Sequence, residues 1–173
     1  MLDVLNKEQI LKEYEMTKLI RYNCRKRIVD EDLAQHSFFV AMFCLRILSQ
    51  IPATDKMYKN ILSFAILHDA PELLMGDFPH TLKLAYPEIA KALEGVEKDY
   101  YKDNWPAYVE MFNSLTELEQ EIITLADAYS VAQYTENEIV LGNSTEEMEQ
   151  IRKNALARID VSTSKINELL KED

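Results

Sequence analysis

The chain has 173 residues, of which 47% are hydrophobic, and carries a formal net charge of −11 at pH 7. This length suits one domain with a buried core, and a content of only three glycines and five prolines argues against a turn-rich β-sandwich or barrel. The acidic balance argues against a surface for nucleic-acid polymers, because such surfaces are basic.

The sequence also lacks the features of a secreted or membrane protein. No apolar run reaches about 18 residues, the length that suggests a membrane span, and the N-terminus has no basic and apolar signal sequence. The two cysteines, Cys24 and Cys44, show neither a metal-binding spacing nor a disulfide pattern. We therefore expect a cytoplasmic protein with reduced thiols and no membrane partner.

Helical periodicity runs through the N-terminal half of the chain. It predicts a helix over residues 7–20, then a polar and irregular segment over 21–31. A strongly apolar helix is expected from about residue 32 to 51, where Pro52 ends it. The next helix is expected from about residue 56 to 70, and Pro71 should impose a kink or a fresh start there.

Further helices are expected over about residues 87–102, 106–113, 116–141 and 144–170. Thr116 with Glu119, and Ser144 with Glu147, have the spacing of N-terminal capping boxes. No strand alternation, repeat or linker stands out. We predict an all-α fold of about six to seven helices, forming one domain over residues 1–173.

Two adjacent residues, His68 and Asp69, lie late in an apolar helical run and are the most informative feature of the chain. A neutral imidazole beside a carboxylate offers two ligands to a divalent metal ion. A carboxylate buried beside apolar residues needs such a partner, because burying even an uncharged polar group without one costs about 2–7 kcal/mol. The pair therefore predicts a metal site.

Other residues could complete this site. His36 is the candidate third ligand, since His80 is expected in a loop beyond the motif, and Asp127 is the candidate fourth, an acid in an apolar run. Glu72 and Asp77 follow His68 closely and could orient water and move protons. Taken singly, each is more often a core histidine or a surface acid, and only their joint occurrence favours a site.

A basic cluster precedes His36. It is either a solvated loop or an anchor for phosphate, and consists of Lys18, Arg21, Arg25, Lys26 and Arg27.

Together these residues resemble the H…HD…D signature of the HD-domain metal-dependent phosphohydrolases. More narrowly, residues 15–143 resemble the 5′-deoxynucleotidase branch, to which phage dATP triphosphohydrolases are related. The matching positions are Arg21, Tyr22, Glu31, His36, Ser37, Val40, Ala41, Met42, His68, Asp69, Glu72, Gly76, Asp77, Pro79, Lys83, Asp127, Gly142 and Asn143.

The resemblance implies roles for these positions. One divalent transition ion (Co, Mn, Fe or Zn) would be held by His36, His68, Asp69 and Asp127. Glu72 would orient or deprotonate the attacking water, and Asp77 would contact the sugar hydroxyl or the leaving group. Substrate would be bound by Arg21 on the phosphate, Tyr22 on the sugar, Lys83 as a second phosphate contact and Ser37 as a weaker one.

The chain departs from this branch at two positions. Tyr22 stands where the branch has tryptophan, which weakens exclusion of a 2′-hydroxyl. Gln35 replaces the glutamate usual before the first metal histidine, and we expect this change to tune the site.

We therefore predict hydrolysis of a nucleotide phosphate ester, with release of phosphate from a (deoxy)nucleoside monophosphate. Two alternatives are a dNTP triphosphohydrolase that releases triphosphate, and a non-catalytic helical module with a structural metal. The resemblance also implies a homo-oligomer, a dimer or larger.

Overall fold

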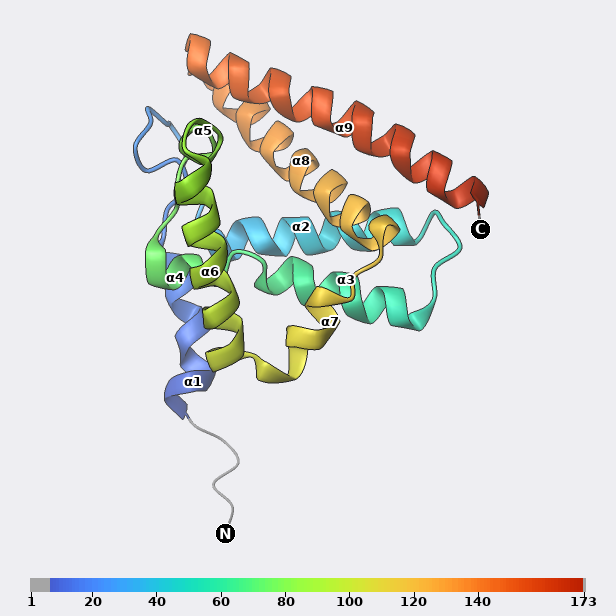
Figure 1. Cartoon of the computed structure of the whole chain (residues 1–173). Coiled ribbons are helices and arrows are strands. Elements are labelled where there is room, and N and C mark those ends of the chain that lie inside the picture. The colour runs from blue at the N-terminus through green and yellow to red at the C-terminus, as the bar shows by residue number, and fades with distance from the viewer. Residues whose placement is uncertain (1–6, 173) are drawn as a thin grey trace.

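The computed structural model describes residues 7–172 and shows an all-α architecture (Figure 1), which confirms the predicted fold class. The chain is 76% helical, and the described residues form no strand. Seven α-helices have six residues or more: α1 (Lys7–Lys12), α2 (Leu33–Leu48), α3 (Asp55–Leu67), α5 (His80–Ala85), α6 (Pro87–Asn104), α8 (Glu117–Val140) and α9 (Glu146–Glu172). The shorter elements are α4 (Glu72–Met75), α7 (Val109–Asn113) and the 3₁₀ turns η1 (Glu13–Lys18) and η2 (Pro106–Tyr108).

Several helix boundaries follow from the caps that the sequence supplies. The Thr116 hydroxyl accepts from the Glu119 N–H at 3.2 Å, and the Glu119 carboxylate accepts from the Thr116 N–H at 2.8 Å, which confirms the first predicted capping box. The second prediction was one residue early. Thr145, and not Ser144, accepts from the Met148 N–H at 3.3 Å, and α9 begins at Glu146.

Three further elements differ from the predictions. The helix expected over residues 7–20 is α-helical only to Lys12 and then tightens into η1. The expected loop around His80 is the start of α5, although the His80 side chain lies outside the described residues. The third predicted helix stops at Leu67, so His68 and Asp69 lie in the turn that follows it.

The core lies where α2, α3 and α8 pack together, and α9 runs alongside α8 (Figure 1). Its fully buried apolar side chains include Val40, Cys44, Ile61 and Ile122. A second apolar cluster joins η1 and α6 to the N-terminal turn of α2 and to the turn after α3. These two clusters fix the two chain segments that carry the histidines. No helix in the described part of the chain is both long and apolar enough to cross a membrane.

Candidate metal centre and active site

Two segments of the chain bring the predicted ligands together. His36 lies in the first turn of α2 and is fully buried. His68 and Asp69 lie in the turn between α3 and α4, which closes with bonds from Ala70 N–H to Leu67 O and from Glu72 N–H to Asp69 O. Pro71 disfavours helical backbone at the preceding residue, which explains why α3 ends where it does. One ligand atom from each of His36, His68 and Asp69 lies within 4.8 Å of the other two.

Asp127 lies against one side of this cluster. Its Oδ1 is 3.1 Å from His36 Nε2, and Asp69 Oδ2 is 3.5 Å from the same nitrogen. His68 Nε2 is 3.3 Å from Asp69 Oδ1. Asp127 contacts His36 but is not part of the three-residue cluster. The structure thus gathers three of the four predicted ligands closely and places the fourth beside one of them.

The donor atoms fit a transition-metal ion. His36 Nε2 is buried and faces the carboxylate oxygens of Asp127 and Asp69. His68 Nδ1 lies 2.8 Å from the Ala65 carbonyl oxygen, which fixes the proton on Nδ1 and leaves the Nε2 lone pair free to bind. Two imidazoles and a carboxylate are ligands that Zn²⁺ and its neighbours accept. His36, His68 and Asp69 could therefore hold such an ion, with Asp127 within reach.

Electrostatics keep these ligands in their binding forms. Burial, and to a smaller extent the Arg21 guanidinium, lower the pKa of His36, so that the ring is neutral at pH 7. Burial acts to raise the pKa of Asp127, but the hydrogen bond from His36 and the charge of Arg21 outweigh it and hold the pKa well below its usual range. A neutral imidazole and an ionised carboxylate are the forms that ligate metals.

Glu72 begins α4 and faces the acids of the site. Its Oε2 is buried without a hydrogen-bond partner among the described residues. Burial, together with the charges of Asp69 and Asp77, raises the pKa of Glu72 to about 9, although Arg21 and Lys83 act against the shift. Glu72 is therefore a half-buried carboxyl group that can hold a proton at neutral pH, as a group that transfers protons must.

Asp77 and Tyr22 contact each other. Asp77 Oδ2 accepts from the Tyr22 N–H at 3.0 Å, at a residue whose φ of 55° is unusual for a side chain of this size. The Tyr22 ring stacks on Tyr134 with centroids 4.8 Å apart and planes 2° from parallel. Asp77 therefore fixes the backbone that presents Tyr22.

The basic cluster is largely paired with acids. Lys18 pairs with Glu15 at 2.6 Å and Arg27 with Asp30 at 2.5 Å, while Arg25 forms an ion pair with Glu147. Arg21 is the member that reaches the site. Its Nη1 lies 2.9 Å from Glu31 Oε2 and 2.6 Å from His36 Nδ1.

Lys83, on α5, lies 3.9 Å from Glu97 and close enough to Glu72 to influence its pKa. Ser37 is buried, and its hydroxyl has no partner among the described residues.

Four residues near the site have contacts that the sequence did not predict. Glu31 pairs with Arg21, and Ser130 Oγ lies 3.0 Å from His36 Nδ1. Tyr134 stacks on Tyr22, and Glu138 accepts from backbone N–H groups of the segment that precedes α2. Ser130 stands three residues after Asp127, so helical spacing from that acid could have indicated it.

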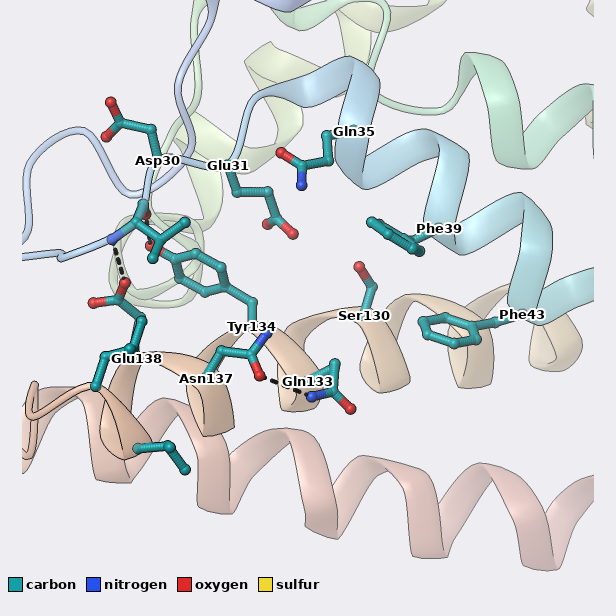
Figure 2. Close-up of a pocket in the computed structure, with 13 residues that line it drawn as sticks. Asp30, Glu31, Gln35, Phe39, Phe43, Ser130, Gln133, Tyr134, Asn137 and Glu138 are labelled. Atoms are coloured by element: carbon teal, nitrogen blue, oxygen red, sulfur yellow. Dashed lines mark hydrogen bonds between the residues drawn. The ribbon is translucent and has the colours of Figure 1, made fainter.

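A cavity of about 450 Å³ lies between α2, α8 and residues 29–31 (Figure 2). Glu31 and Ser130 point into it from opposite sides and also contact Arg21 and His36 respectively. The three clustered ligands do not line it. The cavity therefore adjoins the candidate metal centre without including it.

Comparison with known families decides what this arrangement belongs to. Residues 11–170 match the family model of the YfbR-like 5′-deoxynucleotidases. The chain belongs to the YfbR-like family. This membership makes it a metal-dependent nucleotide phosphohydrolase, so the predictions of family and of an enzyme are confirmed.

Solved structures share the fold of this YfbR-like protein. An HD-domain phosphohydrolase from Listeria innocua is 20% identical, with a TM-score of 0.75 over 95% of this chain and 85% of that chain. The cyanophage S-2L HD phosphohydrolase, bound to dA and one catalytic Zn²⁺ ion, is 13% identical, with a TM-score of 0.66 over 99% and 100%. A conserved hypothetical protein from Pyrococcus furiosus is 20% identical, with a TM-score of 0.71 over 97% and 100%. No curated protein matches the sequence significantly.

Proposed function

We propose that this YfbR-like protein is a 5′-deoxynucleotidase that releases phosphate from (deoxy)nucleoside monophosphates, and that residues 1–173 form a single HD phosphohydrolase domain. The observation that supports this reaction is the gathering of His36, His68 and Asp69 within 4.8 Å of one another, beside the half-buried carboxyl group of Glu72. A site built only to hold a structural ion has no use for an acid with a pKa of about 9 next to it.

His36, His68, Asp69 and Asp127 would hold one divalent ion of Co, Mn, Fe or Zn. Such an ion supplies Lewis acidity that offsets the charge developing on phosphorus. Glu72 exchanges a proton with the attacking water, since a cation beside it brings its pKa down toward neutrality. Asp77 contacts the leaving group or the sugar, and Tyr22, held by Asp77 and stacked on Tyr134, packs against the sugar.

The charge distribution favours a monophosphate over a triphosphate. Arg21 and Lys83 also pair with acids, but they are the two cations that act on the pKa of Glu72, whereas Lys18, Arg25 and Arg27 pair with Glu15, Glu147 and Asp30. With Ser37 as a weaker contact, Arg21, Lys83 and a divalent ion, less the charges of the ligands Asp69 and Asp127, would leave about two positive charges, which balance one phosphate group. A triphosphate carries about two more negative charges and would need further cations.

The test is a screen of nucleoside mono- and triphosphates against Mn²⁺, Co²⁺, Fe²⁺ and Zn²⁺, with products identified. Orthophosphate from dAMP supports the proposal, whereas tripolyphosphate from dATP indicates the triphosphohydrolase. Asp69→Ala should abolish the activity and Asp99→Ala, an acid on the exposed face of α6, should not. Metal binding without turnover of any nucleotide would favour the non-catalytic module.

We further propose that the protein forms a homo-oligomer through α2. Four apolar side chains at spacings of one, four and seven residues stay exposed on this helix: Phe38 (59%), Phe39 (41%), Met42 (47%) and Leu45 (38%). Met42→Glu should shift a dimer or larger assembly toward monomer in analytical ultracentrifugation, and a wild type that sediments as a monomer would refute this. A cytoplasmic location fits the two free cysteines.

A further inference from the structure

The two histidines of the site are held in different ways at their second ring nitrogen. His68 Nδ1 faces a backbone carbonyl, which accepts only, so the proton stays on Nδ1. His36 Nδ1 faces two groups, Arg21 Nη1 at 2.6 Å and Ser130 Oγ at 3.0 Å. The tautomer of His68 is therefore fixed, whereas His36 can adopt either neutral tautomer.

Arg21 and a metal ion on Nε2 require opposite tautomers of His36. A guanidinium can only donate, so a hydrogen bond from Arg21 requires a lone pair on Nδ1 and puts the ring proton on Nε2. A metal ion bound to Nε2 requires the lone pair there and puts the proton on Nδ1. With that proton on Nδ1, His36 Nδ1 and Arg21 Nη1 would be two donors 2.6 Å apart. Two donors at this distance repel each other, so one of the two groups has to move.

Ser130 resolves this conflict. Its hydroxyl can accept as well as donate, it is 3% exposed, and Figure 2 shows it projecting from α8 toward α2. Glu31, 6% exposed, already binds Arg21 at 2.9 Å and can keep the guanidinium when it leaves His36.

We propose that Ser130 is a positioning residue that accepts the Nδ1 proton of His36 when metal binds, and that Arg21 then turns from His36 to Glu31 and the substrate phosphate. This inference rests on the proposed function, because it takes the metal site as given. It makes the phosphate-binding arginine available only in the metal-loaded protein. Hydrolysis and metal loading are thereby coupled through one imidazole ring.

Zinc affinity of the full-length protein, measured by isothermal titration calorimetry, tests the role of Ser130. Ser130→Ala should weaken zinc binding by about 10–100-fold, the usual effect of losing the partner of a ligating histidine. Ser130→Thr, which keeps the hydroxyl, should restore most of the affinity. The control is Ser162→Ala, an equally buried serine on α9 outside the site, which should bind zinc as the wild type does.

Imidazole nitrogen shifts of ¹⁵N-histidine-labelled protein report the tautomer directly. In the wild type, zinc should move the His36 proton from Nε2 to Nδ1, and in Arg21→Met the proton should be on Nδ1 before zinc is added. Wild-type zinc affinity in Ser130→Ala, or a His36 proton that does not move, would overturn the inference and leave the proposed function intact. A wild type that binds none of the four metal ions would contradict the metal site itself.

Discussion

Replacing Glu138 should test how the segment that carries Arg21 and Tyr22 is held. Glu138 is fully buried near the end of α8 and accepts from the N–H groups of Ile28 at 2.8 Å and Val29 at 2.7 Å. Figure 2 shows the Glu138 side chain. The Asn143 side-chain amide donates a third bond at 2.6 Å. One carboxylate therefore joins α8 to a segment more than 100 residues earlier in the sequence.

The magnitude follows from these three bonds. Each is a bond to a charged acceptor, worth roughly 1.5 kcal/mol at the lower end of its range. Ile28 and Val29 are 50% and 43% exposed, so their N–H groups partly regain water when the carboxylate is lost. Glu138→Ala should therefore lower the free energy of unfolding by about 3 kcal/mol. Glu138→Gln, which keeps one acceptor oxygen, should lower it by about half as much.

The effect should also depend on pH. Burial acts to raise the pKa of Glu138, but the donors Asn143, Val29 and Ile28 outweigh it and lower the pKa. A carboxyl group whose pKa is lower in the folded state stabilises the protein above its unfolded pKa of about 4.3, and this stabilisation is lost as the pH falls through the folded value. The difference between wild type and Glu138→Gln should thus shrink as the pH drops below about 4.

Urea unfolding followed by circular dichroism at pH 7 and between pH 5 and 3 measures both effects. Glu168→Gln, an exposed acid on α9, is the control and should leave the urea midpoint within error. If Glu138→Ala unfolds at the wild-type midpoint, the carboxylate does not hold the segment and the reasoning is wrong. If the variant is less stable with unchanged pH dependence, packing and not charge explains the loss.

Further outcomes are expected at the site. Glu72→Gln should lower kcat by about 10²–10⁴ and change zinc affinity little, in steady-state kinetics and calorimetry; an equal loss of both would make Glu72 a ligand. Asp127→Asn should weaken zinc binding at least tenfold, and unchanged affinity would limit the ligand set to His36, His68 and Asp69. Chelation should lower Tm, and zinc at about 100 times its Kd should restore about 2.7 kcal/mol of stability; a Tm insensitive to zinc contradicts the site.

Local signals account for the parts of the fold that the sequence predicted. The periodicity of α2 and α8 and the capping box at Thr116 depend only on residues a few positions apart, so both helices were placed within about three residues. α5 was missed because six residues are too short to show a period, and it follows Pro79 without a side-chain cap. The 3₁₀ form of η1 has no comparable sequence signal.

The candidate site also contains residues with a local sequence signal and residues without one. His68, Asp69 and Glu72 are close in sequence, and their order resembled a family pattern that the match over residues 11–170 confirmed. Ser130, by contrast, reaches His36 across 94 residues. Tyr134 reaches Val29 across 105, so neither contact exists until α8 packs against α2 and the segment before it. Contacts that form only when the helices pack together could not be predicted from the spacing of residues in the sequence.

Three acids of the chain have a structural role in the segment over residues 21–31. Outside an isolated bridge between Ile20 and Asp32, this segment has no regular structure of its own, and three carboxylates hold it. Asp77 binds the Tyr22 N–H, Glu31 binds Arg21, and Glu138 binds the N–H groups further along. Each of these acids is occupied with a donor and so repels an anionic substrate less than its formal charge suggests. We therefore expect that a bound divalent ion, together with Arg21 and Lys83, attracts a phosphate group to a chain with a net charge of −11.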